Sequence, residues 1–357
     1  MSTKNHISEA SFYEYRIPNT RIESFDDFTK VTAEKDGLTG NACKRDTIQF
    51  MVRNQTWTIK KLFIDPDGHN QINTFDCCNE ARSGKPVKES DWICLQANAD
   101  IERVVADADA EAITYLLQLA LAQKVTWSEL GFRGAGGFAL KQARSVRIAN
   151  HPNPIPTFYN SDGGQIKKYL EASYPVFQQD PKWWKMTLDW YAFGCENNVV
   201  EVSGLIFSML LERATIWIDK ATVIPPQISA SLRTSLSDKD KRNDLAGKIK
   251  AFFQEKVAPE WDDDRNQMLM NSLRSWNDGM SYKKKVKRAF ESYSLDVPKN
   301  SVLDDRNALA HNGKVSNTPD LQQYDQEVRR CVSELLLKLL DYSGPYYAPG
   351  SQHDKII

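Results

Sequence analysis

A proline- and glycine-rich stretch, HPNPIPTFYNSDGG at residues 151–164, separates two parts of this 357-residue chain that differ in hydrophobic pattern. Before it, segments such as TIQFMVRNQTWTIKKLFI (47–64) are rich in Val, Ile, Thr and aromatic residues, which favour β-strands. After it, apolar residues recur at helical spacing in almost every segment. The change predicts a mixed α+β region at residues 1–155, followed by an all-α helical-bundle domain at residues 156–350.

Within the first part, strands are expected at 47–64 and 91–97, and a helix is expected at 109–123, where the apolar period changes from two to 3.6. The segment GFRGAGGFAL (131–140) is glycine-rich, but it lacks the Lys-Ser/Thr of a P-loop and the glycine spacing of a dinucleotide-binding loop. A flexible turn is therefore expected there rather than a nucleotide site.

The most apolar window of the second part covers residues 199–218 and carries charged residues within it, so it predicts a buried core helix rather than a membrane span. A final helix is expected to begin at Pro319, with Thr318 as its N-cap, and to stop before Gly344-Pro345. Further helices are expected at 164–179, 181–197, 240–257, 265–277 and 281–294.

Charge is balanced over the whole chain, with 46 Lys and Arg residues against 47 Asp and Glu residues. Any contact with nucleic acid must therefore come from a local basic patch. One candidate is SYKKKVKR (281–288), whose cations lie beside aromatic residues and could follow an RNA backbone, although a solvated helix face is an equal alternative. Its basic residues are Lys283, Lys284, Lys285, Lys287 and Arg288.

Nothing in the sequence indicates a metal, a cofactor or a membrane. His69, Cys77, Cys78 and Cys94 lack the short paired spacing of zinc modules, and the acidic run EWDDDR (260–265) is typical of a helix start. The N-terminus has no apolar core of a secretion signal, so a cytoplasmic location with free thiols is expected.

The segment DDRNALAHNGKV (304–315) holds one of only five histidines in the chain. Good helix formers between Ser301, a possible N-cap, and Asn312-Gly313, a typical stop, predict a helix of about three turns. On this helix Asn307 and His311 are four residues apart and share a face. His311 falls in the last turn, where the helix dipole favours the imidazolium ion.

These residue types suit the cleavage of RNA through attack of the ribose 2′-hydroxyl group on the adjacent phosphate. That reaction needs a base, an acid and a positive clamp for the phosphate, and it does not require a metal ion. Arg306 fits the clamp, His311 fits the acid or base, and Asn307 can orient either group. Since one chain offers only one such histidine, the chemistry predicts a composite site in a two-fold dimer.

The pattern Arg306-Asn307-x-x-x-His311, near the end of a helical region, resembles the R-x4-6-H motif of HEPN ribonucleases, and RNALAHNG is similar to the ApeA-like HEPN group. The resemblance covers roughly residues 180–345. It implies a helical HEPN domain, with Arg306 and His311 catalytic and Asn307 orienting. It also implies a supporting acidic residue on an earlier helix, Glu212 or else Glu201. Gly313 stands where HEPN toxins paired with a nucleotidyltransferase have a tyrosine, which disfavours that subgroup.

The sequence thus predicts a homodimeric, metal-independent endoribonuclease that cuts tRNA or mRNA, as a toxin or an antiphage defence effector. Residues 1–155 would sense a phage-derived trigger or restrain the nuclease, and an antitoxin is a further expected partner. Two alternatives remain. One is a HEPN-like module that binds RNA, a nucleotide or a protein without cutting. The other is a scaffold in which His311 only caps its own helix.

Overall fold

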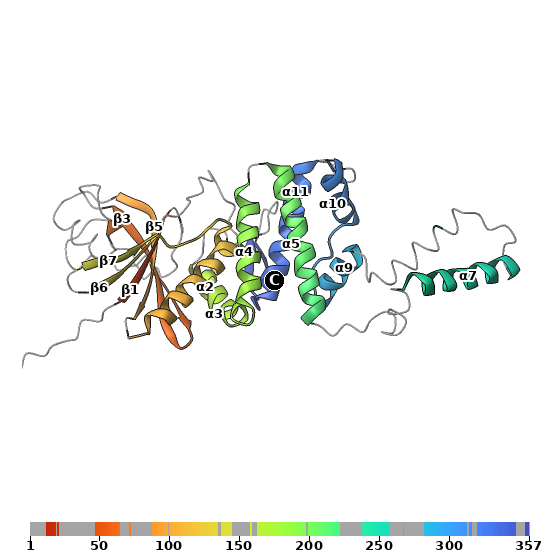
Figure 1. Ribbon diagram of the computed structural model, residues 1–357. Coiled ribbons are helices and arrows are strands. Elements are labelled where there is room, and N and C mark those ends of the chain that lie inside the picture. Colours follow the sequence, from red (N-terminus) through yellow and green to blue (C-terminus); the bar gives the residue numbers. More distant parts are fainter. Residues whose placement is uncertain are drawn as a thin grey trace, which may run out of the picture. The chain divides into compact units, whose positions relative to one another are not determined.

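A computed structural model describes the greater part of the chain. The described residues are 12–18, 20, 47–64, 71–72, 88–98, 100–134, 137–144, 158, 163–197, 199–221, 238–256, 267, 282–312, 314–315, 320–347 and 354–356. The chain forms two compact units, one made of Met1–Leu210 with Asp305–Ile357, and the other made of Leu211–Asp304. The structure is mixed α+β, as the sequence predicts (Figure 1). A separate all-α domain and a boundary near residue 155 stay predictions.

The first unit contains an antiparallel sheet whose strands run in the order β2-β3-β5-β1-β6-β7, with β4 pairing with β3. Every pair of neighbouring strands in it is antiparallel. The strands are β1 (Phe12–Ile17), β2 (Thr47–Val52), β3 (Gln55–Ile64), β4 (Gln71–Ile72), β5 (Lys88–Asn98), β6 (Glu129–Gly134) and β7 (Gly137–Ala143).

The segment 47–64 forms two strands rather than one. β2 and β3 pair as a hairpin, and their two-residue turn is Arg53-Asn54, with φ angles of 48° and 63°. Positive φ at both positions gives the turn that matches the right-handed twist of paired strands. The turn is hard to predict from the sequence, because neither residue is the glycine that usually signals positive φ angles.

Most of the glycine-rich segment 131–140, where a flexible turn was expected, belongs to two paired strands, and residues 135–136 lie outside the described residues. Residues 131–134 end β6, and residues 137–140 begin β7. Cross-strand pairing supplies the order here, with Gly134 opposite Gly137.

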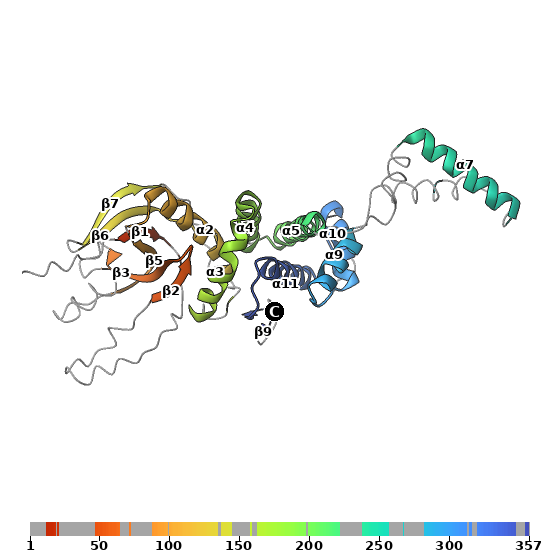
Figure 2. The same cartoon turned by 90° about the horizontal axis from the view of Figure 1, so that it is seen from below.

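Helix α2 (Arg103–Leu121) connects β5 to β6 and covers one face of the sheet (Figure 2). Because β1 is antiparallel to both β5 and β6, those two strands run the same way, and a crossover connection is required. Tyr15, fully buried, donates a hydrogen bond from its hydroxyl group to Asp107 on α2 at 2.8 Å. Trp57 and Leu95 are buried on the same face of the sheet, which therefore forms a hydrophobic core with α2.

The opposite face of the sheet buries polar side chains. The fully buried carboxylate of Glu14 accepts hydrogen bonds from Arg16 Nε at 3.0 Å and from Gln96 Nε2 at 2.7 Å. Arg16 Nη1 also lies 3.5 Å from Glu129 Oε2. The buried charges are thus paired, as the cost of desolvating them requires.

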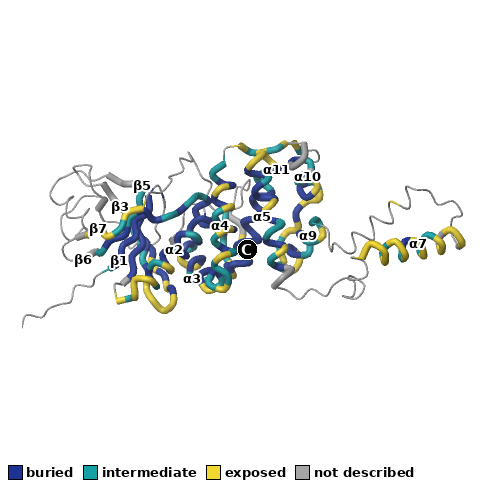
Figure 3. Tube along the Cα trace, in the orientation of Figure 1, coloured by how far each residue is buried: buried dark blue, intermediate teal, exposed yellow. Residues whose placement is uncertain are grey.

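Three helices follow the sheet: α3 (Gly163–Phe177), α4 (Pro181–Glu196) and α5 (Val200–Ala221). They confirm the helices predicted at these positions, and α5 is the expected long apolar helix. Among the described residues, no helix is both long enough and apolar enough to cross a bilayer. Figure 3 shows how the buried residues gather on the inward sides of these helices.

Helix α11 (Leu321–Leu339) ends the helical part of the first unit, and its predicted ends were wrong. Its N-cap is Asp320, whose Oδ1 accepts a hydrogen bond from the backbone N–H of Gln323 at 2.6 Å. Thr318 and Pro319 lie outside the described residues. The helix stops five residues before Gly344, and Pro345 begins strand β8 (Pro345–Tyr347), which pairs with β9 (Asp354–Ile356).

The second unit contains α7 (Lys239–Lys256) and α9 (Tyr282–Ser292), in agreement with the predicted helices there. The helix expected at 265–277 lies almost wholly outside the described residues. Helix α10 (Asn300–Asn312) begins in this unit and carries the Arg306 motif into the first one. It starts one residue before the predicted cap, Ser301.

Candidate functional site on helix α10

The RNALAH segment is helical throughout, as its sequence predicts. Arg306, Asn307 and His311 belong to α10, which ends at Asn312. Arg306 is partly exposed, whereas its neighbour Asp305 is fully buried. The side chains of Asn307 and His311 lie outside the described part of the structure. Their backbone positions are four residues apart and so share a helix face.

Tyr324 on α11 is the central buried residue beside this helix. A Cβ atom added at Gly204 of α5 would lie 3.1 Å from Tyr324 Cε1 and 3.5 Å from Leu309 Cδ2. Helices α5, α10 and α11 therefore meet at Gly204, where the missing side chain makes room for the tyrosine ring. Leu309 lies between Arg306 and His311 in sequence, so the motif helix is packed directly onto this contact.

The hydroxyl group of Tyr324 is hydrogen-bonded to Ser208 of α5, with 2.6 Å between the two oxygens. Ser208 Oγ also lies 2.7 Å from the carbonyl oxygen of Gly204 and can donate its proton there. Either hydroxyl group can be the donor in the bond between Tyr324 and Ser208. Burial raises the pKa of Tyr324 to about 12, so the phenol keeps its proton at neutral pH.

Two charges of α10 act on the Tyr324 hydroxyl group. The Asp305 carboxylate raises its pKa and the Arg306 guanidinium lowers it, although both effects are smaller than that of burial. The motif arginine is thus electrostatically close to a fixed, buried polar group. Sequence reasoning did not find Tyr324 or Ser208, because a single tyrosine or serine in an apolar helix carries no recognisable pattern.

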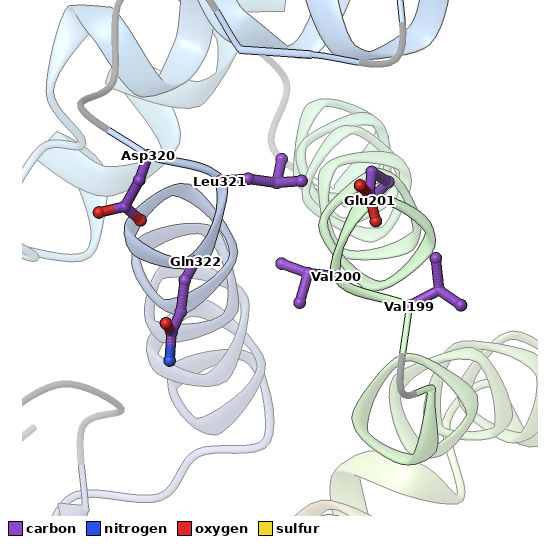
Figure 4. A pocket seen from close by; sticks show the side chains of 6 residues that line it. All are labelled: Val199, Val200, Glu201, Asp320, Leu321 and Gln322. Carbon is purple, nitrogen blue, oxygen red and sulfur yellow. The ribbon is translucent and has the colours of Figure 1, made fainter.

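A shallow pocket of about 580 Å³ lies between the N-terminal ends of α5 and α11. Figure 4 shows Val200 and Leu321 facing each other across it, with Glu201, Asp320 and Gln322 around them. Glu201 precedes Gly204 by three residues on α5, and Leu321 precedes Tyr324 by three on α11. The pocket is therefore about one helical turn from the contact that α10 makes at Gly204.

The two candidate acids fall in different places. Glu201 is exposed and lines the pocket in the first unit. Glu212, the preferred candidate, lies farther along α5 in the second unit, where it is partly buried. Its role as the supporting acid stays a prediction.

The basic residues at 283–288 all lie on α9, where Val286, Ala289 and Phe290 are buried. Lys284 is exposed, and Lys285, Lys287 and Arg288 are partly exposed. Lys283 is already engaged, because its Nζ lies 2.9 Å from Asp304 Oδ2. The five cations are therefore not equivalent, a difference that the sequence does not reveal.

Within the described ranges, no three His, Cys, Asp or Glu side chains form a group suited to a metal ion. Cys94, Cys195 and Cys331 are free and buried. Burial raises the pKa of the Cys195 thiol to about 11, which makes it a poor nucleophile. His69, Cys77, Cys78 and the acidic run 260–265 lie outside the described residues.

Comparisons with protein-family models, curated proteins and solved structures find no match for this chain.

Proposed function

We propose that this chain is a metal-independent endoribonuclease that acts as a homodimer, with Arg306, Asn307 and His311 of each protomer in a composite site. The proposal rests on one observation above all. Arg306 is partly exposed on a helix that is held from beneath by Leu309, the buried Asp305 and Tyr324. A cation presented at a fixed position is what stabilisation of a charged phosphorane requires, because a preorganised charge need not rearrange during the reaction.

The reaction would proceed by proton transfers alone. One His311 takes the proton of the ribose 2′-hydroxyl group as its oxygen attacks the adjacent phosphorus. The second His311, from the partner protomer, protonates the departing 5′-oxygen, which leaves a 2′,3′-cyclic phosphate. The Arg306 pair binds the charged phosphate oxygens, and Asn307 orients an imidazole. Both histidines lie in the last turn of their helices, where the dipole stabilises the protonated form.

The biological role follows as part of the same proposal. The enzyme would cut tRNA or mRNA as a toxin or as an effector of antiphage defence in the cytoplasm. The sheet-containing region would respond to a phage-derived trigger, and an antitoxin could restrain the nuclease.

The test is cleavage of RNA by the full-length protein in EDTA. We expect products ending in a 2′,3′-cyclic phosphate, and no cleavage of a substrate whose 2′-hydroxyl groups are methylated. Arg306→Ala and His311→Ala should each lower the rate by at least a hundredfold. Arg103→Ala and His151→Ala are matched controls that keep activity. Cleavage that is unchanged in both motif variants would refute the site.

The composite site has its own test, which is a mixture of the two inactive variants. Because each half of the site needs an intact motif from both protomers, Arg306→Ala mixed with His311→Ala should not regain full activity. Complete restoration would contradict the shared site. RNA binding without cleavage by the wild-type protein would favour the non-catalytic alternative.

The supporting acid can be identified in the same assay. Glu201→Gln and Glu212→Gln each remove one charge while keeping the size of the side chain. The sequence resemblance favours Glu212, whereas Glu201 lies about one turn from the contact at Gly204. If one variant cleaves RNA more slowly but is as stable as wild type, its glutamate is the supporting residue. If neither variant cleaves more slowly, both glutamates are excluded.

A further inference from the structure

Tyr324 and Ser208 are 116 residues apart in the sequence and join α11 to α5 beneath the motif helix. The ring of Tyr324 is fully buried and contacts Gly204, and its hydroxyl group is hydrogen-bonded to Ser208. Leu309 of α10 packs onto the same glycine. The side chain of Tyr324 thus limits how closely α5, α10 and α11 can pack at Gly204.

The bond to Ser208 also holds the hydroxyl group of Tyr324 at a fixed place beside the charges of α10. Arg306 and Asp305 are the two charges of α10 that this oxygen senses. A fixed dipole near a guanidinium favours one placement of that cation over others.

We propose that Tyr324 is a positioning residue for Arg306: through its bond to Ser208 and its contact with Gly204, it sets the place of the motif helix and of the arginine charge. This inference rests on the proposed nuclease function for its catalytic consequence, although the structural link can be measured without activity. Tyr324 is not expected to touch the RNA, because it is fully buried.

The chain contains a second buried tyrosine–serine pair that serves as a comparison, although its tyrosine, Tyr191, also bonds to Arg329. Tyr191 on α4 is buried, and its hydroxyl oxygen lies 2.9 Å from Ser333 Oγ of α11. Ser333 donates to the carbonyl oxygen of Arg329, four residues earlier, as Ser208 does to Gly204. Both pairs therefore join a tyrosine to a serine that is bonded to its own helix, but only the Tyr324 pair lies beside α10.

The experiment compares Tyr324→Phe with Tyr191→Phe, each of which removes one hydroxyl group and keeps the ring. Thermal unfolding should shift downward in both, and more in Tyr191→Phe, whose lost hydroxyl group also bonds to the buried Arg329. Only Tyr324→Phe should lower kcat, by about tenfold to a hundredfold with KM changed less than about twofold, because misplacement by an ångström acts on the chemical step. Ser208→Ala should also lower kcat, as Tyr324→Phe does.

Two outcomes would overturn the inference: equal kcat values for Tyr324→Phe and wild type, or an equal fall in kcat for both tyrosine variants. If the wild-type protein cuts no RNA, the proposed function fails while this inference remains testable by amide hydrogen exchange. Faster exchange of the α10 amides in Tyr324→Phe than in Tyr191→Phe supports it, and equal exchange contradicts it.

Discussion

Arg53, at the tip of the β2–β3 hairpin, lies with its Nε 3.4 Å from Oδ1 of Asp109, a carboxylate buried in helix α2. Tyr174 of α3 donates a hydrogen bond from its hydroxyl group to the same oxygen. The guanidinium also donates to Gln178 at 3.1 Å and lies 5.8 Å from the centre of the Tyr174 ring. The tip of the hairpin is thus attached to two helices.

Arg53→Ala should weaken this attachment. Asp109 is only 1% exposed, so loss of its cation leaves a buried charge, but Arg53 is 46% exposed, which reduces the effect. We expect the free energy of unfolding in urea to fall by about 1–2 kcal/mol. Arg103→Ala is the control, since Arg103 is 50% exposed, its partner Asp107 on the same helix is half-buried, and the loss should cost about 0.5 kcal/mol or less. Equal losses would contradict the prediction.

Asp109→Asn should change how stability depends on pH. Burial raises the pKa of Asp109 above its ordinary value of 3.8, while Tyr174 and Arg53 lower it. The folded state therefore holds this proton at a pH where the unfolded state has lost it, so the contribution of Asp109 to stability falls as pH rises above 3.8. The unfolding free energy of wild type minus that of Asp109→Asn should decrease with pH. A difference that grows with pH would mean that folding lowers the pKa of Asp109, which would contradict the prediction.

Gly204→Ala should destabilise the first unit. The new Cβ atom would lie 3.1 Å from the buried ring of Tyr324, and overpacking of this kind costs about 1–3 kcal/mol. The gain in helix propensity, about 1 kcal/mol, offsets only part of it. Gly247→Ala is the control, because nothing lies within 4 Å of the added atom and only the gain remains. Urea unfolding gives the stability of both variants, and amide exchange shows where it changes. A Gly204→Ala protein more stable than wild type would refute the close contact.

The basic helix α9 should contribute unequally to RNA binding. Lys284 is exposed, whereas Lys283 is held by Asp304. Lys284→Ala should therefore reduce the slope of log affinity against log salt by about 0.7 for single-stranded RNA, and Lys283→Ala should reduce it less. Lys182→Ala on α4 provides an exposed control. Identical slopes for all three variants and wild type would show that α9 does not contact RNA.

The sequence predicts the elements of this fold better than their ends. Long apolar repeats are enough to predict α5, and the RNALAH helix follows from its helix formers. The turn at Arg53-Asn54 was missed because its positive φ angles are imposed by strand pairing and not by glycine. The cap of α11 was misplaced because Thr318 and Asp320 are both capable caps, and only the bond to Gln323 distinguishes them.

The candidate site could be predicted only where its residues are neighbours in sequence. Arg306, Asn307 and His311 form a local pattern, so they could be proposed together from the sequence. Tyr324 and Ser208 come together through tertiary packing, which no local pattern encodes. The same holds for the ion pair of Lys283 with Asp304, which needs the relative placement of two helices.

The first unit is discontinuous, since residues 305–357 complete what residues 1–210 begin. Phe158, Tyr169 and Tyr342 share one aromatic cluster, with ring centres 5.3–5.8 Å apart, so early and late parts of the chain are packed together. Synthesis must therefore reach Tyr342 before this cluster can close, and it must reach Tyr324 before the bond to Ser208 can form. A nascent chain that ends just after α10 lacks both contacts, so the motif helix gains this packing only after synthesis has passed it.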